Sequence, residues 1–190
     1  SLRRQRQMCI RDSYSFDEAL RLSKKLENLD IKWFEEPLSP EFYDQYADFK
    51  SKSHIPVAAG ECEYLRYGFQ KLLNKNCVDF LQLDICSCGG LTEAKRIAAL
   101  SSSKGVKVIP HTWGSGIAFF AAINFISNLE PIPGRLYNED AYIEYDRTEN
   151  KIRENIIKNN IVMSDGYITV NNEPGLGVEI DETYLNELKM

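Results

Sequence analysis

Four titratable residues stand directly behind short apolar runs of the sequence. They are Glu35, Glu61, Asp84 and His111, and a fifth residue, Glu144, lies inside an alternating apolar and polar segment. Runs of this kind are typical of buried strands. Because the strands of a parallel barrel present their carboxyl ends at one rim, we expect the five side chains to converge on one site.

Glu35 and Glu61 are candidates for metal ligands. Carboxylate oxygens without a paired cysteine or a further histidine suit Mg²⁺ better than Zn²⁺. Each glutamate alone could equally be a solvated charge at the rim, but the series of strand-end acids favours a metal site. We expect the next residue, Glu36, to be structural, because strand alternation turns it away from the barrel axis.

His111 and Asp84 are candidates for a general base and its partner. A carboxylate on one ring nitrogen fixes the tautomer of the imidazole and raises the basicity of the other nitrogen. His54 precedes a strand on the opposite rim, and we predict that it is a surface residue. A protonated Glu144 beside a bound carboxylate could donate a hydrogen bond to a developing enolate.

The elements that must position these residues alternate between strand and helix. Apolar runs predict strands at 31–35, 55–61, 78–84, 106–110 and 142–146. Helical spacing and caps predict helices at 15–28, 65–73, 92–100 and 117–126, and one that begins at Ser39 and buries Phe42, Tyr46 and Phe49. Strand, helix, strand units predict a parallel sheet. A doubly wound sheet would have its site at one switch point, whereas here every strand ends in an acid or a histidine. We therefore predict the α/β class and part of a (β/α)8-type TIM barrel.

The chain divides into three parts by pattern. Residues 1–13 are basic and aperiodic in an otherwise acidic chain, and we interpret them as an artefact of translated adapter sequence or as a disordered arm. Residues 14–150 carry the barrel pattern. Residues 151–190 break the rhythm with a hairpin that turns at Asp165-Gly166 and a short final helix capped by Asp181, so we expect them to lie outside the barrel.

Composition limits the class of function. The chain has 190 residues, whereas a whole eight-unit barrel needs about 250. A net charge of −5 argues against nucleic acid as a partner. No apolar run approaches the ~18 residues of a membrane span, and no signal-peptide pattern opens the chain, so we expect no membrane partner. Five cysteines without metal-site spacing favour a reduced, cytoplasmic protein.

Five ordered motifs resemble the enolase superfamily, most closely its mandelate racemase subgroup and the acid-sugar dehydratases within it. The motifs are Trp33-Phe34-Glu35-Glu36-Pro37, Gly60-Glu61, Gln82-Leu83-Asp84 with Gly89-Gly90-Leu91-Thr92, Pro110-His111-Thr112-Trp113-Gly114, and the tail 165–179. The resemblance implies a (β/α) barrel with an α+β capping domain, to which the C-terminal segment returns. It also implies a Mg²⁺ cofactor, Glu35 and Glu61 as its second and third ligands, a His111–Asp84 base dyad, and Glu144 at the eighth strand.

The sequence departs from the family pattern at its start. Cys9 occupies the position of the first metal ligand, and the nearby Asp12 is out of register. The lysine motif of the second strand and most of the capping domain have no counterpart. We therefore expect an N-terminally truncated chain with an incomplete metal site.

The implied reaction is removal of the proton α to a carboxylate, followed by dehydration of a sugar acid to a 2-keto-3-deoxy acid. A racemase or epimerase that uses the same dyad is the alternative among enzymes, and a non-catalytic remnant is the alternative outside them. The implied partners are a small carboxylate substrate and, for the full-length parent, further copies of the same chain. Trp113 and Tyr64 are candidates for the substrate pocket.

Overall fold

The computed structural model describes residues 7–9, 14–133, 140–159 and 161–189. Its main sheet has five parallel strands whose order in space follows the sequence. The strands are β1 (Gln7–Cys9), β2 (Trp33–Glu35), β3 (Val57–Ala59), β4 (Phe80–Leu81) and β5 (Lys107–Val108). An α-helix follows each of the five strands in the sequence. This arrangement confirms the predicted partial (β/α) barrel.

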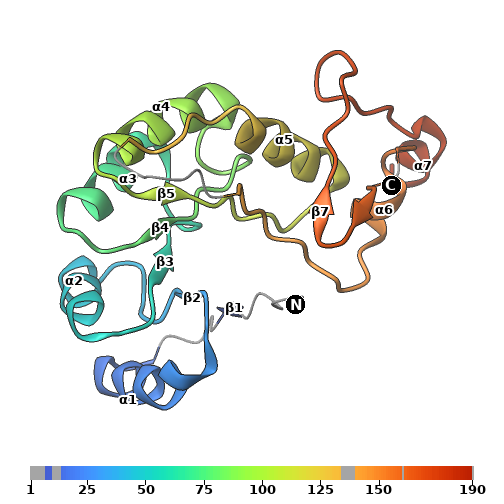
Figure 1. Cartoon of the computed structure of the whole chain (residues 1–190). Coiled ribbons are helices and arrows are strands. Elements are labelled where there is room, and N and C mark those ends of the chain that lie inside the picture. The colour runs from blue at the N-terminus through green and yellow to red at the C-terminus, as the bar shows by residue number, and fades with distance from the viewer. Residues whose placement is uncertain (1–6, 10–13, 134–139, 160, 190) are drawn as a thin grey trace.

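The α-helices that follow the strands cover one face of the sheet (Figure 1). They are α1 (Phe16–Leu26), which continues into the 3₁₀ turn η1 (Glu27–Leu29), α2 (Tyr43–Lys52), α3 (Leu65–Asn74), α4 (Gly90–Ser103) and α5 (Gly116–Ser127). The start of α1 has a capping box of Ser15 and Glu18, in which the main-chain amide and the hydroxyl of Ser15 both donate to the carboxylate of Glu18, at 3.0 and 2.6 Å.

The second helix begins later than the sequence predicts. It begins at Tyr43, and the side chain of Phe42 is 52% exposed, so the prediction of a buried Phe42 is wrong. The physical reason is that the preceding segment is fixed separately. Leu38 is buried, its carbonyl oxygen accepts a 2.6 Å hydrogen bond from the Tyr46 hydroxyl, and residues 39–42 form a turn.

Alternation along the strands separates two apolar layers. The larger layer lies between the sheet and the helices and includes Phe34, Val57, Leu81 and Leu83. The smaller layer lies on the opposite face of the sheet, where Trp33, Ala58 and Ile109 pack with Phe80 and Tyr142. On this second face, which we call the inner face, the strands continue into polar residues. The candidate site lies there.

Two segments differ from the sequence-based assignment. Residues 7–9, which the pattern excluded from the fold, pair with β2 so that Cys9 lies opposite Glu35. Asp12 lies outside the described residues. Residues 142–146, predicted as a strand, form no regular strand in the structure. Side-chain and main-chain contacts with Thr112 hold this segment instead, so the five strands of the sheet include β1 and not residues 142–146.

The C-terminal part lies beyond α5 (Figure 1). It contains α6 (Lys151–Asn155), the hairpin of β6 (Met163–Ser164) and β7 (Tyr167–Ile168), and α7 (Glu182–Glu187). The hairpin turns at Asp165 and Gly166, whose φ angles of +51° and +85° match a turn in which both central residues are left-handed. Asp181 accepts a 2.9 Å hydrogen bond from the amide of Tyr184 and so caps α7.

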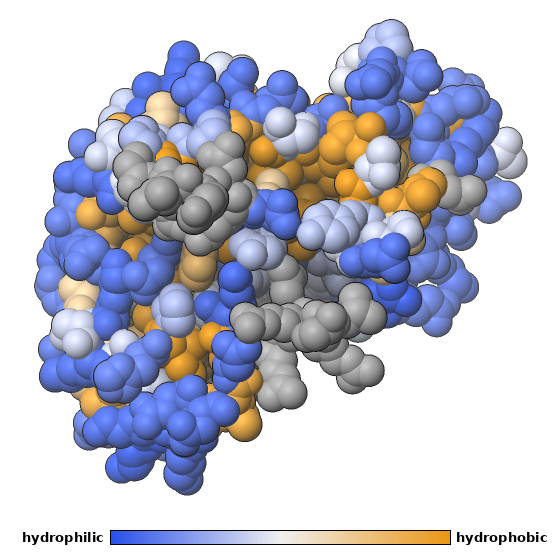
Figure 2. Space-filling view, in the orientation of Figure 1, coloured by the Kyte–Doolittle hydropathy of each residue, from blue (hydrophilic) through white to orange (hydrophobic). Residues whose placement is uncertain are grey.

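An apolar cleft of about 300 Å³ separates the hairpin from α5. Phe120 and Ile123 line it from the helix, and Val162, Ile168 and Val170 line it from the hairpin segment. In Figure 2 apolar side chains gather in this region, between the body of the molecule and its C-terminal part. Within the described ranges, no helix is long and apolar enough to cross a membrane. Cys62, Cys77, Cys86 and Cys88 are free thiols.

The contact between α3 and α4 includes a buried charge. Glu93 is 5% exposed, and its carboxylate accepts hydrogen bonds from the Arg66 guanidinium at 2.6 and 2.8 Å and from Arg96 at 3.0 Å. The amide of Arg66 also donates to it, at 3.0 Å. These hydrogen bonds, chiefly those of the Arg66 side chain, lower the pKa of Glu93 from 4.5 to about 2.

Replacing Glu93 should therefore change how the free energy of unfolding depends on pH. The pKa of Glu93 is lower in the folded than in the unfolded chain, so its ionised form stabilises the fold above pH 4.5 and this contribution is lost as the pH falls towards 2. We expect Glu93→Gln to lower the free energy of unfolding at pH 7, with the difference shrinking below pH 4.5. Urea unfolding at several pH values measures it, with the exposed Glu130→Gln as the control. A difference that stays constant down to pH 2.5 would contradict the assigned pKa.

Candidate active site

Asp84 and His111 meet at the ends of neighbouring strands. Backbone hydrogen bonding continues beyond β4 and β5 as an isolated parallel bridge between these two residues. The Nδ1 atom of His111 lies 2.9 Å from an Asp84 carboxylate oxygen, as the sequence predicts. The Nε2 atom lies 3.1 Å from Glu61, so the imidazole stands between two carboxylates. The second oxygen of Asp84 accepts from the amides of Cys86 and Ser87, which fixes the aspartate.

Charges and burial act in opposite directions on this pair. Burial alone would raise the pKa of Asp84, but hydrogen bonds from His111 and the Cys86 amide outweigh it and hold the pKa below its ordinary value. Burial alone would lower the pKa of His111, but Asp84 and the charges of Glu61 and Glu144 raise it above its ordinary value. The result is an ionised aspartate beside a strongly basic imidazole.

A second polar group lies deeper on the inner face and is organised by Gln82. The Nε2 atom of Gln82 donates to Glu35 and to Glu144, each at 2.7 Å. Glu35 is 1% exposed and also accepts a 3.1 Å hydrogen bond from the indole of Trp33. No role for Gln82 follows from the sequence alone. Its signal was a polar residue in the middle of a run that alternation predicts to be buried.

Glu144 reaches the same group from the segment 142–146. One of its carboxylate oxygens accepts a 3.1 Å hydrogen bond from the amide of Thr112, and its main-chain carbonyl accepts a 2.6 Å hydrogen bond from the Thr112 hydroxyl. Burial and the charge of Glu35 raise the pKa of Glu144 well above its ordinary value. The protonated form that the sequence suggested is therefore favoured by its surroundings.

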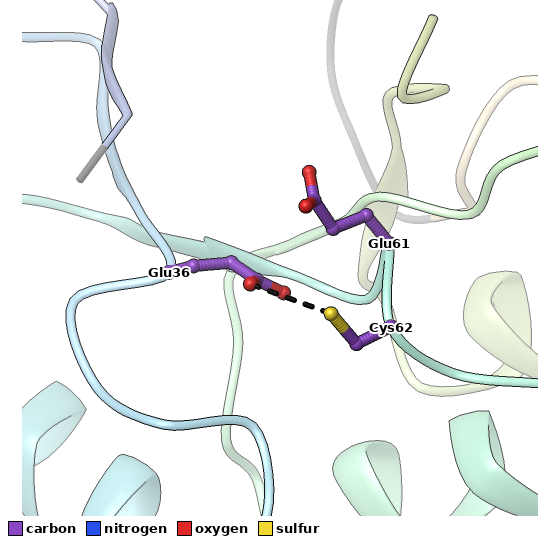
Figure 3. A group of neighbouring side chains, drawn as sticks. All are labelled: Glu36, Glu61 and Cys62. Carbon is purple, nitrogen blue, oxygen red and sulfur yellow. Dashed lines mark hydrogen bonds between the residues drawn. The ribbon is translucent and has the colours of Figure 1, made fainter. Parts of the chain in front are cut away.

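Glu36 lies just beyond the end of β2 and beside Glu61. Ligand atoms of Glu36, Glu61 and Cys62 all lie within 4.8 Å of one another, and Figure 3 shows the Glu36 carboxylate directed at the Cys62 thiol. β2 ends at Glu35, and Glu36 adopts a left-handed φ of +39°. Burial and the charge of Glu61 raise the pKa of Glu36 to about 7.

This group fits a hard divalent cation in part. The carboxylates of Glu36 and Glu61 converge, and the Oε1 atom of Glu36 is buried without a hydrogen-bond partner in the described part of the chain, a position that a cation would satisfy. The Cys62 thiol does not suit Mg²⁺, which takes oxygen ligands. Glu35 is not in this group, and its register partner Cys9 stands where the first metal ligand is expected.

Comparison with known proteins gives a consistent set of relatives. The family described as "Enolase C-terminal domain-like" matches residues 10–184. The chain is 38% identical over 177 residues to a D-galactarolactone cycloisomerase of Agrobacterium fabrum, and 30% identical over 176 residues to an arabinonate dehydratase of Saccharolobus solfataricus. Among solved structures, the 3,6-anhydro-D-galactonate cycloisomerase of Zobellia galactanivorans superposes with a TM-score of 0.84 at 44% identity.

These matches cover nearly all of this chain and about half of each relative. The two curated relatives are matched over 93% of this chain and over 47% and 45% of their own lengths. The solved structure is matched over 92% of this chain and 47% of its own. The chain thus spans about half the length of the proteins it resembles.

The Thr112 hydroxyl should hold the segment 142–146 in place. Thr112→Val keeps the side-chain shape and leaves the half-buried carbonyl oxygen of Glu144 without this donor, so we expect the free energy of unfolding to fall by about 1–2 kcal/mol. Amide hydrogen exchange should also become faster in residues 142–146. Urea unfolding and exchange mass spectrometry measure the two effects. Thr112→Ser keeps the hydroxyl and is the control. If both variants have the same free energy of unfolding and the same exchange rates, this hydrogen bond does not hold the segment.

Proposed function

The chain belongs to the enolase C-terminal domain-like family, and from this premise we propose that it supplies the catalytic barrel residues of an enzyme that removes the proton α to the carboxylate of a sugar acid. The observation that carries the proposal is the imidazole of His111 held between Asp84 and Glu61. A basic nitrogen fixed by a carboxylate at a strand end is the device that abstraction of a weakly acidic proton needs. The relatives that act on sugar acids indicate the substrate class.

We assign the proton transfer to the Nε2 atom of His111. Its Nδ1 atom is occupied by Asp84, which fixes the tautomer and stabilises the imidazolium that forms when Nε2 takes the proton. The electron pair of the broken C–H bond moves into the substrate carboxylate and gives an enediolate. Loss of the β-hydroxyl, which leaves as water after it gains a proton, then gives an enol that tautomerises to a 2-keto-3-deoxy acid.

Glu144 is assigned the role of a hydrogen-bond donor to the developing enediolate. A carboxyl group can donate only when it is protonated, and burial beside Glu35 favours that form. Thr112 and Gln82 fix the orientation of Glu144, so the donor is in place before charge develops.

We propose Mg²⁺ as the cofactor, with Glu35 and Glu61 as ligands and Glu36 as a further candidate that the structure adds. When bound, Mg²⁺ would stabilise the negative charge of the enediolate electrostatically. Glu61 is a ligand in either set, with Glu35 or with Glu36 as the other glutamate. Its contact with His111 would also place the imidazole at the edge of the cation site.

Dehydration and cycloisomerisation are the two candidate outcomes of this chemistry. Dehydratases among the relatives support the first. The second gains support because the two cycloisomerases reported above share 38% and 44% identity with the chain. A racemase or epimerase would need a second base on the opposite face of the substrate. Assays on a library of sugar acids and their lactones separate these outcomes. Racemisation yields no semicarbazide-reactive keto acid, and the form of the substrate consumed, open-chain acid or ring, separates dehydration from cycloisomerisation.

A non-catalytic role is the alternative of a different class. The position of Cys9 opposite Glu35 favours it, because a cysteine there supplies no hard oxygen ligand. Recovery of the reading frame upstream of residue 14 from the source DNA would reveal whether a third acidic ligand precedes the barrel. A longer protein that neither binds Mg²⁺ nor turns over any sugar acid would overturn the proposed enzyme.

Loss of the base should abolish turnover in that longer protein. We expect His111→Asn to lower kcat by about 10⁴-fold and Asp84→Asn by about 10²-fold or more, because the first removes the proton acceptor and the second removes the charge that fixes it. Steady-state kinetics on the best sugar acid measure both. His54→Asn, at an exposed histidine remote from the site, is the control. Full activity in His111→Asn would refute the assignment of the base.

Metal affinity should distinguish the glutamates. We expect Glu35→Gln and Glu61→Gln each to weaken Mg²⁺ binding by about tenfold or more, since each removes an anionic oxygen ligand. Isothermal titration calorimetry measures the affinity, and the exposed Glu173→Gln is the control. If Glu36→Gln weakens binding and Glu35→Gln does not, Glu36 replaces Glu35 as the ligand. Unchanged affinity in Glu61→Gln would contradict both arrangements.

A further inference from the structure

Gln82 links the two carboxylates of the deeper polar group, and none of the chemistry described above requires it to react. It is 1% exposed and lies on the inner face two residues beyond Phe80 and two before Asp84. Its main-chain amide donates to the carbonyl of Ala59 at 2.9 Å, so the backbone at this position is fixed by the sheet. The side chain of Gln82 is therefore attached to a backbone that the sheet holds in place.

We propose that Gln82 is a positioning residue for the proposed reaction, with an amide that sets the distance and orientation of Glu144 relative to Glu35. Both hydrogen bonds of its Nε2 atom are 2.7 Å long. They join residues that are 47 and 62 positions away in the sequence. The inference rests on the proposed function, because Glu144 is significant for the reaction only if the site is catalytic.

The chemistry of the position favours a primary amide. Where two glutamates approach one point, an NH₂ group can donate a hydrogen bond to each of them without adding a charge. A carboxylate there would place a third acceptor against two others. A flipped amide would turn its oxygen towards both glutamates. The observed orientation instead leaves the Oε1 atom without a hydrogen-bond partner among the described residues, which indicates that the two glutamates decide how the amide is oriented.

The segment 142–146 depends on side chains for its placement. It has no regular strand pairing, and the hydrogen bonds described for Glu144 come from Thr112 and Gln82. Thr112 holds the main chain and one carboxylate oxygen. Gln82 holds the other oxygen, so the two contacts together fix the direction of the carboxyl group and not only its position.

A double-mutant cycle tests the positioning role in the protein that is active on sugar acids. We expect Gln82→Leu to lower kcat by about 10²-fold with KM nearly unchanged, a loss comparable to that of one preorganised donor. In the Glu144→Gln background the same change should have little further effect, because a residue that acts through Glu144 has nothing left to position. Gln70→Leu, the same change at an exposed glutamine, should leave kcat unchanged. Full kcat in Gln82→Leu, or equal losses in both backgrounds, would overturn the proposal.

A second measurement needs no turnover and can be made on the chain of 190 residues. It tests whether the Gln82 amide holds Glu35 and Glu144 together, an arrangement that we call the clamp. The side-chain amide signals of Gln82 in a ¹⁵N NMR spectrum are assigned as those missing from Gln82→Leu, or from Gln82→Met if that variant does not fold. We expect them to exchange slowly with water and to shift in Glu144→Gln, while those of Gln70 do neither. Signals that exchange as fast as those of Gln70 overturn the clamp. Slow exchange in this chain together with no turnover by the longer protein would refute the proposed function and leave the clamp intact.

Discussion

Crowding of carboxylates on one face of a parallel sheet is the constraint on which the rest of the site depends. Glu35, Glu36, Glu61 and Glu144 share this region with a single imidazole. Ionised carboxylates this close together repel strongly where water is scarce, so the four glutamates cannot all be ionised without a compensating positive charge. Two of the acids have raised pKa values, and His111 is drawn towards its protonated form. A region with these properties is poised to accept a cation and to move protons.

Much of the fold could be predicted because it depends on local pattern. Apolar runs that end in acids or in histidine mark the strands, and the short helical segments between them leave a parallel sheet as the simplest solution. The junction of Asp84 and His111 follows from the same reasoning, since it needs only that neighbouring strands end at one rim. Turn chemistry at Asp165 and Gly166 is equally local.

Some features of the site could not be predicted from the sequence. They depend on contacts between residues distant in the sequence, or on the backbone conformation of a single residue. The left-handed backbone at Glu36, whose carboxylate lies beside Glu61 and Cys62, has no signal in the alternation of the strand. The segment around Glu144 has the alternating pattern of a strand, yet side chains and not a ladder hold it. Gln82 has no motif of its own that reveals a role. Its significance becomes visible only when two glutamates from distant segments appear on either side of it.

Glu144 is held in the site by hydrogen bonds with side chains and not by strand pairing, and this has an evolutionary consequence. A residue carried by a regular strand can move only by a register slip, and a slip of one position exchanges the two faces of the whole strand. A residue held by side chains such as Gln82 and Thr112 can be shifted by changing one of them, with the sheet unaffected. Descendants of this scaffold could thus vary the acid group opposite the imidazole by single substitutions, while the barrel that carries it stays the same.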